Sequence, residues 1–255
     1  MAYVRMRPDG AMATLSRGSV DLGALSWSVQ TPLSPAGHEA ITRSAIGAGV
    51  ISFPVAGKPT TRVLTPAEQA TIVAGNRSVD LGWAGTGVLF AFSKGEQKRH
   101  ALRREYGQPL AAALADIIAS LRAQHAGILA EADPKKQLHR IGQALHLVQD
   151  SFSPAHTDRR PGSGWCIAYV RNFGRGRAPV EHGVPSDDRD QVARSRGEAS
   201  QATAASRRYL SIVFKALYGL AKPDPTATAE AAAEFARFVS DLFRSCSGAT
   251  TVTGM

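Results

Sequence analysis

The sequence predicts an all-α protein, a multi-helix bundle of about six helices with long loops between them. Apolar residues recur near every 3.6 positions in several segments, and these segments carry residues that typically begin and end helices. No clear run of residues alternates between apolar and polar in the manner of strands. We therefore expect one helical domain over residues 36–247, an irregular arm over residues 1–35 and a frayed tail over residues 248–255.

The first two expected helices have local signals at their ends. Residues 37–46, GHEAITRSAI, form the first one. The second begins after Thr65, an N-cap candidate that has Glu68 three residues later, as in a capping box. Pro66 suits the first helical position, and Gly75 is expected to end the helix.

The middle of the chain contains two longer helical segments. Residues 95–131 form a helical stretch that residues 107–109, Gly-Gln-Pro, should interrupt. The next helix begins at Pro134, with Asp133 as its N-cap. Pro154 ends this helix, because proline lacks the amide donor and clashes with the preceding turn.

The C-terminal third begins with a segment that has no helical pattern. Residues 158–186 hold five glycines and three prolines, which indicates a long loop or lid. Two alanine-rich helices are expected to follow, over residues 187–221 and 226–245. Thr226 or Thr228 would begin the last helix.

The composition is that of a soluble globular protein, with 44% hydrophobic and 20% charged residues among 255. A domain of this size can bury a core without metals, so a bound metal would serve chemistry rather than folding. No apolar run approaches the roughly 20 residues that span a bilayer, and the start lacks the apolar core of a standard secretory signal. We expect a protein secreted or exported by another route in preference to a cytoplasmic one.

The charge and the cysteines narrow the possible partners and ligands. A formal net charge of +9 favours anionic partners such as phospholipid head groups or nucleic acid, although a merely basic surface has the same charge. Cys166 and Cys246 are the two cysteines, and the sequence does not decide whether they pair. Any metal would therefore be bound by histidine and carboxylate.

The segment GQALHLVQDSFSPAHT carries a candidate ligand set. His146 and Asp150 are four residues apart, so they lie on one helix face and can chelate a single ion. His139 roughly shares that face, and a turn at Pro154 could direct His156 to the same ion. Imidazole and carboxylate suit zinc. The same spacing also occurs in plain surface pairs, so the motif alone leaves both interpretations open.

The segment LHLVQDSFSPAHT resembles the signature helix of the zinc-dependent phospholipase C and P1-type nuclease superfamily. That signature has a histidine, an aspartate four residues later, then a proline and a second histidine ten residues after the first. The resemblance implies that His146, Asp150 and His156 are zinc ligands and that the fold is the helical bundle of that superfamily. It extends over about residues 37–190.

The resemblance also implies ligands from elsewhere in the chain. In that superfamily an early helix begins with a ligand histidine, which matches His38. An aspartate follows a helix and a Gly-Asn turn, which matches Asp80, and a histidine begins a later helix, which matches His100. With His182, five of the seven histidines occupy ligand positions, and His125 and His139 do not.

The last ligand pair departs from the pattern of the superfamily. There a histidine is followed four residues later by glutamate, whereas His182 is followed at that distance by Ser186. Asp187 and Asp188 come next, and we expect Asp187 to be the ligand. The superfamily also uses a mature N-terminal tryptophan, a role that Trp27 would have only if the chain were cut before it.

The implied function is a zinc-dependent phosphodiester hydrolase with two or three zinc ions. Zinc lowers the pKa of a bound water toward about 7, and Asp80 is the expected general base. The segment SFSPAHT favours the phospholipase C type, which acts on phospholipid head groups. The aromatic residues of the glycine-rich loop, Trp165, Tyr169 and Phe173, would suit peripheral contact with a membrane.

Other interpretations remain open. Arg159 and Arg160 either steer an anionic substrate or belong to a solvated loop, which is the more ordinary case. A single-strand nuclease of the P1 type is the alternative enzyme. A third interpretation is a metal-stabilised helical module without enzymatic activity, such as a toxin or an incompatibility-type domain.

Overall fold

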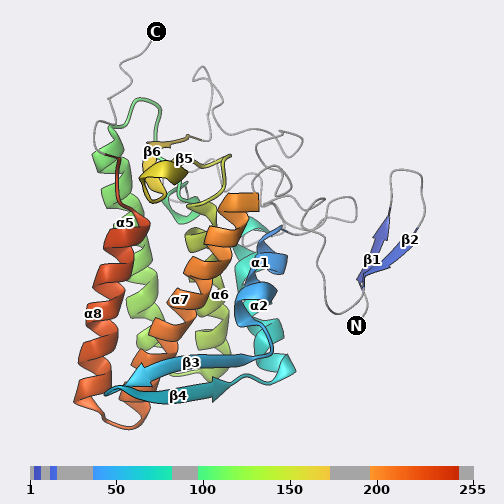
Figure 1. Ribbon diagram of the computed structural model, residues 1–255, viewed down its shortest axis with the longest axis vertical. Coiled ribbons are helices and arrows are strands. Elements are labelled where there is room, and N and C mark those ends of the chain that lie inside the picture. The colour runs from blue at the N-terminus through green and yellow to red at the C-terminus, as the bar shows by residue number, and fades with distance from the viewer. Residues whose placement is uncertain (1–2, 7–11, 16–36, 82–96, 173–195, 247–255) are drawn as a thin grey trace.

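The computed structural model describes residues 3–6, 12–15, 37–81, 97–172 and 196–246 (Figure 1). This part of the chain is mainly helical, as predicted. It contains six α-helices: α1 (Gly37–Ile46), α2 (Pro66–Leu81), α5 (Leu110–Leu129), α6 (Pro134–Asp150), α7 (Arg196–Ala221) and α8 (Pro225–Leu242). It also contains two short 3₁₀ turns, η2 (Lys98–His100) and η3 (Pro161–Ser163).

Three antiparallel hairpins accompany the helices, which the sequence did not predict. They are β1 (Tyr3–Met6) with β2 (Met12–Leu15), β3 (Val50–Val55) with β4 (Lys58–Val63), and β5 (Thr157–Arg160) with β6 (Cys166–Val170). The first lies within residues 1–35, and the third occupies the beginning of the expected loop 158–186. The fold is therefore a helical bundle with small hairpins rather than purely all-α.

Helix α6 is the central element of the bundle. It packs against α1, α2, α5 and α7, while α8 packs along α7 and the β3–β4 hairpin crosses one end of α7 (Figure 1). The apolar stripe of α6 enters the core as its spacing predicts. Its members Leu138, Ile141, Leu145 and Val148 are buried, as is Phe152 just after the helix.

The capping signals before α2 and α6 are confirmed. The Thr65 backbone amide donates to Glu68 Oε2 at 2.7 Å, and the Glu68 amide donates to Thr65 Oγ1 at 3.3 Å. Ahead of α6, Asp133 Oδ1 accepts from the amides of Lys135 and Lys136 at 2.8 and 3.0 Å. Each cap satisfies amides that have no partner inside the helix.

The predicted start of the last helix is wrong by two to four residues. Neither Thr226 nor Thr228 is the N-cap of α8; Asp224 is, and its Oδ1 accepts from the amides of Thr226 and Ala227 at 2.9 and 3.1 Å. Pro225 occupies the first helical position, where its missing amide costs nothing. The residues 187–195 of the preceding expected helix lie outside the described residues.

The predicted long helix over residues 95–131 is only partly present. Its second part is α5, which begins after Pro109 as expected. In the first part, the described residues form the single 3₁₀ turn η2, whose C-cap residue Ala101 has a left-handed φ of 52°. A helix cannot continue through that conformation, so the chain turns away.

The β3–β4 hairpin shows why its strands were missed. Alternate residues of β3 are buried, namely Ile51, Phe53 and Val55, but the strand is short and contains a proline. Ala56 and Gly57 connect the strands with φ values of 47° and 74°, the left-handed conformations of a type I′ turn. An Ala-Gly pair is a weak sequence signal for that turn, because alanine seldom adopts it.

Gly75 does not end α2, contrary to the prediction. The helix continues through it to Leu81, and Gly75 instead lies against the backbone of α6. A Cβ atom on Gly75 would lie 1.9 Å from the carbonyl oxygen of His139, and one on Gly142 would lie 2.0 Å from that of Ile72. The two glycines therefore allow two helix backbones to approach more closely than any other residue would permit.

A disulfide joins Cys166 to Cys246, a pairing that the sequence left open. It connects β6 to the segment after α8, and backbone bonds accompany it: the Ile167 amide donates to the carbonyl of Arg244 at 2.8 Å and the Cys246 amide to that of Ile167 at 2.9 Å. The end of α8 is thus attached to the β5–β6 hairpin. Among the helices described, none is both long and apolar enough to cross a membrane.

Substitution of Gly142 by alanine should separate α2 from α6. The added methyl group meets backbone atoms, which cannot move aside as a side chain can, so we expect the free energy of unfolding to fall by about 2–4 kcal/mol. Gly127→Ala on α5 is the matched control. There the new Cβ meets only the end of the Arg140 side chain, at 3.1 Å, and helix propensity favours alanine by up to ~1 kcal/mol. Urea denaturation of both variants makes the comparison, and equal stabilities would contradict the close-approach argument.

Candidate metal centre

Six of the eight predicted ligands come together around the C-terminal half of α6. His146 and Asp150 project from α6 itself, His38 lies at the start of α1 and Asp80 in the last turn of α2. His100 ends the turn η2, and His156 follows the end of α6. The remaining two, His182 and Asp187, lie outside the described residues, as do Asp188 and Trp27.

Four side-chain atoms form a compact group at this site. His146 Nε2 lies 3.0 Å from Asp150 Oδ2, 3.2 Å from His100 Nδ1 and 3.3 Å from Asp80 Oδ1. His100 Nδ1 lies 3.2 Å from Asp150 Oδ2 and 3.8 Å from Asp80 Oδ1. Ligands about 2.0–2.2 Å from a tetrahedral ion lie roughly 3.3–3.6 Å apart, so these separations fit one ion.

A second group overlaps the first. His38 Nε2 lies 2.9 Å from Asp150 Oδ1, and His38, His146 and Asp150 together can hold an ion, as can Asp80, His100 and His146. Asp150 presents one oxygen to each group, since its Oδ2 faces His100 and His146. The histidines and aspartates of this cluster could therefore hold a metal ion, in either of two groups that have His146 in common.

The site concentrates charge where water has little access. His146 is fully buried, Asp150 is 1% exposed, and Asp80 Oδ2 and His146 Nδ1 have no hydrogen-bond partner among the described residues. Burial by itself lowers the pKa of His146, but Asp150 and Asp80 outweigh it and raise that pKa to about 10. Burial raises the pKa of Asp150, and the neighbouring histidines, His146 first, hold it well below its usual value. Such a set prefers a bound cation, whether a proton or a metal ion.

His156 lies at the edge of the cluster. Its Nδ1 is 3.6 Å from Asp150 Oδ2 and donates to the backbone carbonyl of His100. The turn that brings it there begins after α6, with the His156 amide donating to the Ser153 carbonyl at 2.9 Å. His156 is close enough to remain a predicted ligand, although it belongs to neither of the two compact groups.

Asp80 and His100 reach the site from unexpected local structure. The Gly-Asn pair before Asp80 was expected to be a turn, but both residues lie inside α2, so Asp80 lies on the same continuous helix. His100 was expected at a helix start and instead ends a 3₁₀ turn. The ligand positions come together, while the elements that carry them differ from the prediction.

The sequence did not identify Gln149 as part of the site. Gln149 lies on α6 between His146 and Asp150 in the sequence. Its side chain is fully buried, and its Oε1 lies 2.9 Å from His38 Nδ1 and accepts from Asn76 Nδ2 at 3.2 Å. Its position three residues after His146 places it on the same side of α6. That spacing was the signal that could have identified it.

His125 and His139 do not belong to the cluster. His125 stacks on Phe235 with ring centroids 3.8 Å apart, and its Nδ1 is 3.4 Å from the Tyr209 hydroxyl. His139, expected to share the ligand face of α6, instead has its Nε2 3.2 Å from Ser78 Oγ. Both are packing or hydrogen-bonding residues at other places in the bundle.

Arg159 does not belong to a solvated loop, because its guanidinium is held by backbone carbonyls, and its steering of an anionic substrate stays a prediction. Its guanidinium donates to the carbonyls of Ser151 at 2.5 Å, Trp165 at 2.7 Å and Leu242 at 2.8 Å. The group also lies 4.1 Å above the ring of Phe152. Arg159 thus joins the C-terminal ends of α6 and α8, where helix dipoles favour a cation.

The aromatic residues expected at a membrane interface have contacts within the protein. The Arg103 guanidinium lies 4.2 Å above the ring of Tyr169. A Cβ atom on Gly197 would lie 3.0 Å from the Trp165 ring, so Trp165 packs against the start of α7. Phe173 lies outside the described residues. Trp165 and Tyr169 therefore give no support to membrane contact.

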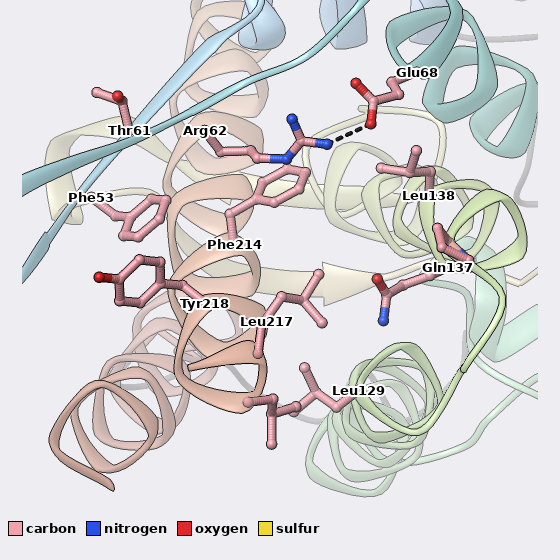
Figure 2. Close-up of a pocket in the computed structure, with 13 residues that line it drawn as sticks. Phe53, Thr61, Arg62, Glu68, Leu129, Gln137, Leu138, Phe214, Leu217 and Tyr218 are labelled. Carbon is pink, nitrogen blue, oxygen red and sulfur yellow. Dashed lines mark hydrogen bonds and ion pairs between the residues drawn. The ribbon is translucent and has the colours of Figure 1, made fainter. Parts of the chain in front are cut away.

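A cavity of about 520 Å³ lies elsewhere in the bundle (Figure 2). Phe53, Phe214 and Leu217 line it, with the Arg62–Glu68 ion pair on one side. Leu138, also in its wall, precedes His146 by eight residues on α6, which corresponds to about 12 Å along the helix axis. The cavity is therefore separate from the metal centre.

Replacement of Arg159 by methionine should destabilise the fold. The carbonyls of Trp165 and Leu242 would lose the guanidinium donor, and that of Ser151 would keep only Thr157 Oγ1, so we expect the free energy of unfolding to fall by about 2–4 kcal/mol. Arg160→Met, at the next and exposed position, is the control and should change stability by less than ~0.5 kcal/mol. Chemical denaturation followed by circular dichroism measures both. Similar losses in the two variants would contradict the role of Arg159.

His125 should make stability depend on pH. Burial lowers its pKa to about 4, from an ordinary value of 6.5, so between these pH values the unfolded chain binds a proton that the folded chain excludes. The contribution of neutral His125 is complete above pH 6.5 and is lost as the pH falls toward 4. His125→Phe keeps the stacking and cannot bind the proton.

The measurement is the free energy of unfolding of both proteins between pH 7 and pH 4. Over that range the wild-type chain should lose about 3 kcal/mol more than the His125→Phe variant. Each group other than His125 titrates in both proteins, so the difference isolates this histidine. Parallel pH profiles would show that His125 is not buried as a neutral ring.

Comparison of the chain with family models, with curated proteins and with solved structures finds no match. The family resemblance is therefore carried by the order and spacing of the ligand residues. Any conclusion about function depends on those residues and on the geometry of the metal centre.

Proposed function

We propose that this protein is a zinc-dependent phosphodiester hydrolase of the phospholipase C type, acting on phospholipid head groups. One observation carries the proposal: two groups of candidate histidine and aspartate ligands overlap at His146, and Asp150 lies beside both at the end of α6. Two ions at adjoining positions, with Asp150 between them, are the arrangement suited to phosphoryl transfer. Their protein ligands would be His38, Asp80, His100, His146 and Asp150, with His156 beside them.

The chemistry of the ligands favours zinc over other ions. Nitrogen and carboxylate ligands at tetrahedral separations suit zinc, whereas magnesium and calcium require mainly oxygen. Both cysteines form the disulfide, so thiolates do not contribute. His182 and Asp187, within residues 173–195, would supply further ligands that could bind a third ion.

Zinc bound here supplies a nucleophilic water near neutral pH and neutralises the charge on phosphoryl oxygens. Asp80 is the proposed general base. Burial raises its pKa, but the nearby histidines, His146 first, lower it overall, so the carboxylate is ionised. Its Oδ2 has no hydrogen-bond partner among the described residues and can accept a proton from water.

Charge and covalent structure support the choice of substrate and location. A net charge of +9 favours an anionic phosphodiester. Disulfides persist in oxidising compartments, so the Cys166–Cys246 bond supports secretion or export. The same charge supports the second candidate, a single-strand nuclease, because polyanions bind basic proteins strongly.

Metal analysis of the purified full chain tests the metal centre. We expect two or more zinc ions per chain by mass spectrometry of the native protein, and loss of at least one in His146→Ala, which belongs to both ligand groups. His139→Gln is the control, because His139 lies on the same helix but outside the cluster. A wild-type chain that binds no zinc at neutral pH would refute the proposal.

Hydrolysis assays then separate the candidate activities. Zinc-loaded protein is given phosphatidylcholine vesicles or single-stranded DNA, with EDTA-treated protein and His146→Ala as negative controls. Release of phosphocholine supports the phospholipase, and release of nucleotides supports the nuclease. Zinc binding with neither product would leave the metal-stabilised helical module as the function.

A further inference from the structure

Gln149 has all of its side-chain hydrogen-bonding positions filled. Its Oε1 faces His38 Nδ1 at 2.9 Å and Asn76 Nδ2 at 3.2 Å. Its Nε2 donates to Thr42 Oγ1 at 2.9 Å and to Ser206 Oγ at 3.3 Å. An amide has two acceptor and two donor positions, so this residue, fully buried, is completely satisfied. Such a buried polar network fixes the positions of its members.

The orientation of this amide determines the protonation of His38. Asn76 presents its Nδ2 to Gln149, and with the amides in this orientation the oxygen of Gln149 faces both Asn76 and His38. The hydroxyls of Thr42 and Ser206 can accept, which suits the nitrogen. Because Gln149 Oε1 is only an acceptor, His38 Nδ1 must carry a proton and donate it.

The other nitrogen of His38 then faces the metal centre. His38 Nε2 lies 2.9 Å from Asp150 Oδ1, in one of the two compact ligand groups. A metal ion can replace a proton on Nε2. The proton on Nδ1 stays on that nitrogen, because it is donated in a hydrogen bond to the Gln149 amide oxygen. In the opposite tautomer, lone pairs of Nδ1 and Oε1 would face each other at 2.9 Å, which is repulsive.

We propose that Gln149 is a positioning residue for the metal centre, which holds His38 in the Nδ1–H tautomer so that Nε2 is the metal ligand. The inference rests on the proposed function, because it assumes that His38 binds zinc. Ligand histidines commonly donate their second N–H to an oxygen that fixes the ring, and loss of that partner weakens metal binding. Here the oxygen belongs to the residue next to another ligand, Asp150.

The same amide also connects the elements that surround the site. Thr42 and His38 lie on α1, Asn76 on α2 and Ser206 on α7, and each bonds to Gln149 on α6. Rotation of the His38 ring would therefore require several of these bonds to break. Gln149 sets both the tautomer of the ring and its direction.

Two substitutions of Gln149 distinguish the effect of its acceptor oxygen from the effect of its N–H donors. Gln149→Glu keeps an oxygen toward His38 but loses the two N–H donors, whereas Gln149→Met has a similar length and loses both functions. We expect zinc affinity to fall 10- to 100-fold in Gln149→Met and to stay within about threefold of wild type in Gln149→Glu. Competition with a chromophoric chelator measures the affinity of the full chain.

Gln143→Met is the matched control. Gln143 lies on the same helix and donates to Ser78 Oγ at 3.3 Å, and this bond involves no predicted ligand. Its substitution should leave zinc affinity unchanged within about twofold. A purely structural role of Gln149 would instead make the buried carboxylate of Gln149→Glu at least as damaging as methionine.

The tautomer itself can be observed in the wild-type chain, which needs no variant to fold. Long-range ¹H–¹⁵N correlation spectra of zinc-loaded protein labelled at histidine should show His38 protonated at Nδ1 and bound through Nε2, with the signal assigned by its loss in His38→Gln. Zinc bound through Nδ1, or wild-type affinity in Gln149→Met, would overturn the inference and leave the proposed function standing. A wild-type chain that binds no zinc would refute the proposed function itself, and zinc binding without hydrolysis would leave the role of Gln149 intact.

Discussion

The close approach of α2 to α6 is the constraint on which the candidate metal centre depends. Gly75 and Gly142 face the partner backbone where no Cβ atom fits, and the candidate ligands Asp80 and His146 follow them on the same two helices. Helices separated by ordinary side chains lie 8–10 Å apart, and Asp80 is too short to reach across a wider gap. Gly75 and Gly142, which have no side chains, thus determine the distance between the candidate ligands Asp80 and His146.

A second requirement is that the charged groups of the centre tolerate burial. Asp150 and His146 have almost no contact with water, so their mutual arrangement must supply what solvent would. Two groups outside the cluster contact these elements: the amide of Gln149 bonds to His38, and the cationic guanidinium of Arg159 bonds to the helix end just beyond Asp150. The centre is therefore preorganised by residues that carry no ligand atom.

The parts of the fold that follow from local chemistry were predictable from the sequence. The cap at Thr65 and Glu68 acts within one turn, and the order of the histidines and aspartates identified six candidate ligands whose side chains come together. Gly75 was misjudged because its role depends on α6, more than sixty residues away, and Arg159 because its partner Leu242 belongs to α8. The short hairpins lack the length that distinguishes a strand from a loop.

The disulfide divides the chain into two separately constrained parts. It closes a loop between residues 80 positions apart, which in the chain-entropy model contributes about 4–5 kcal/mol, and this loop contains α7 and α8. The candidate ligands in the described part of the chain precede Cys166, so a metal ion held by them would cross-link the region from His38 to His156. That region does not overlap the disulfide loop in sequence, so a chain without the disulfide keeps the restriction that these ligands impose. A further ligand at His182 or Asp187, which lie within the loop, would connect the two regions.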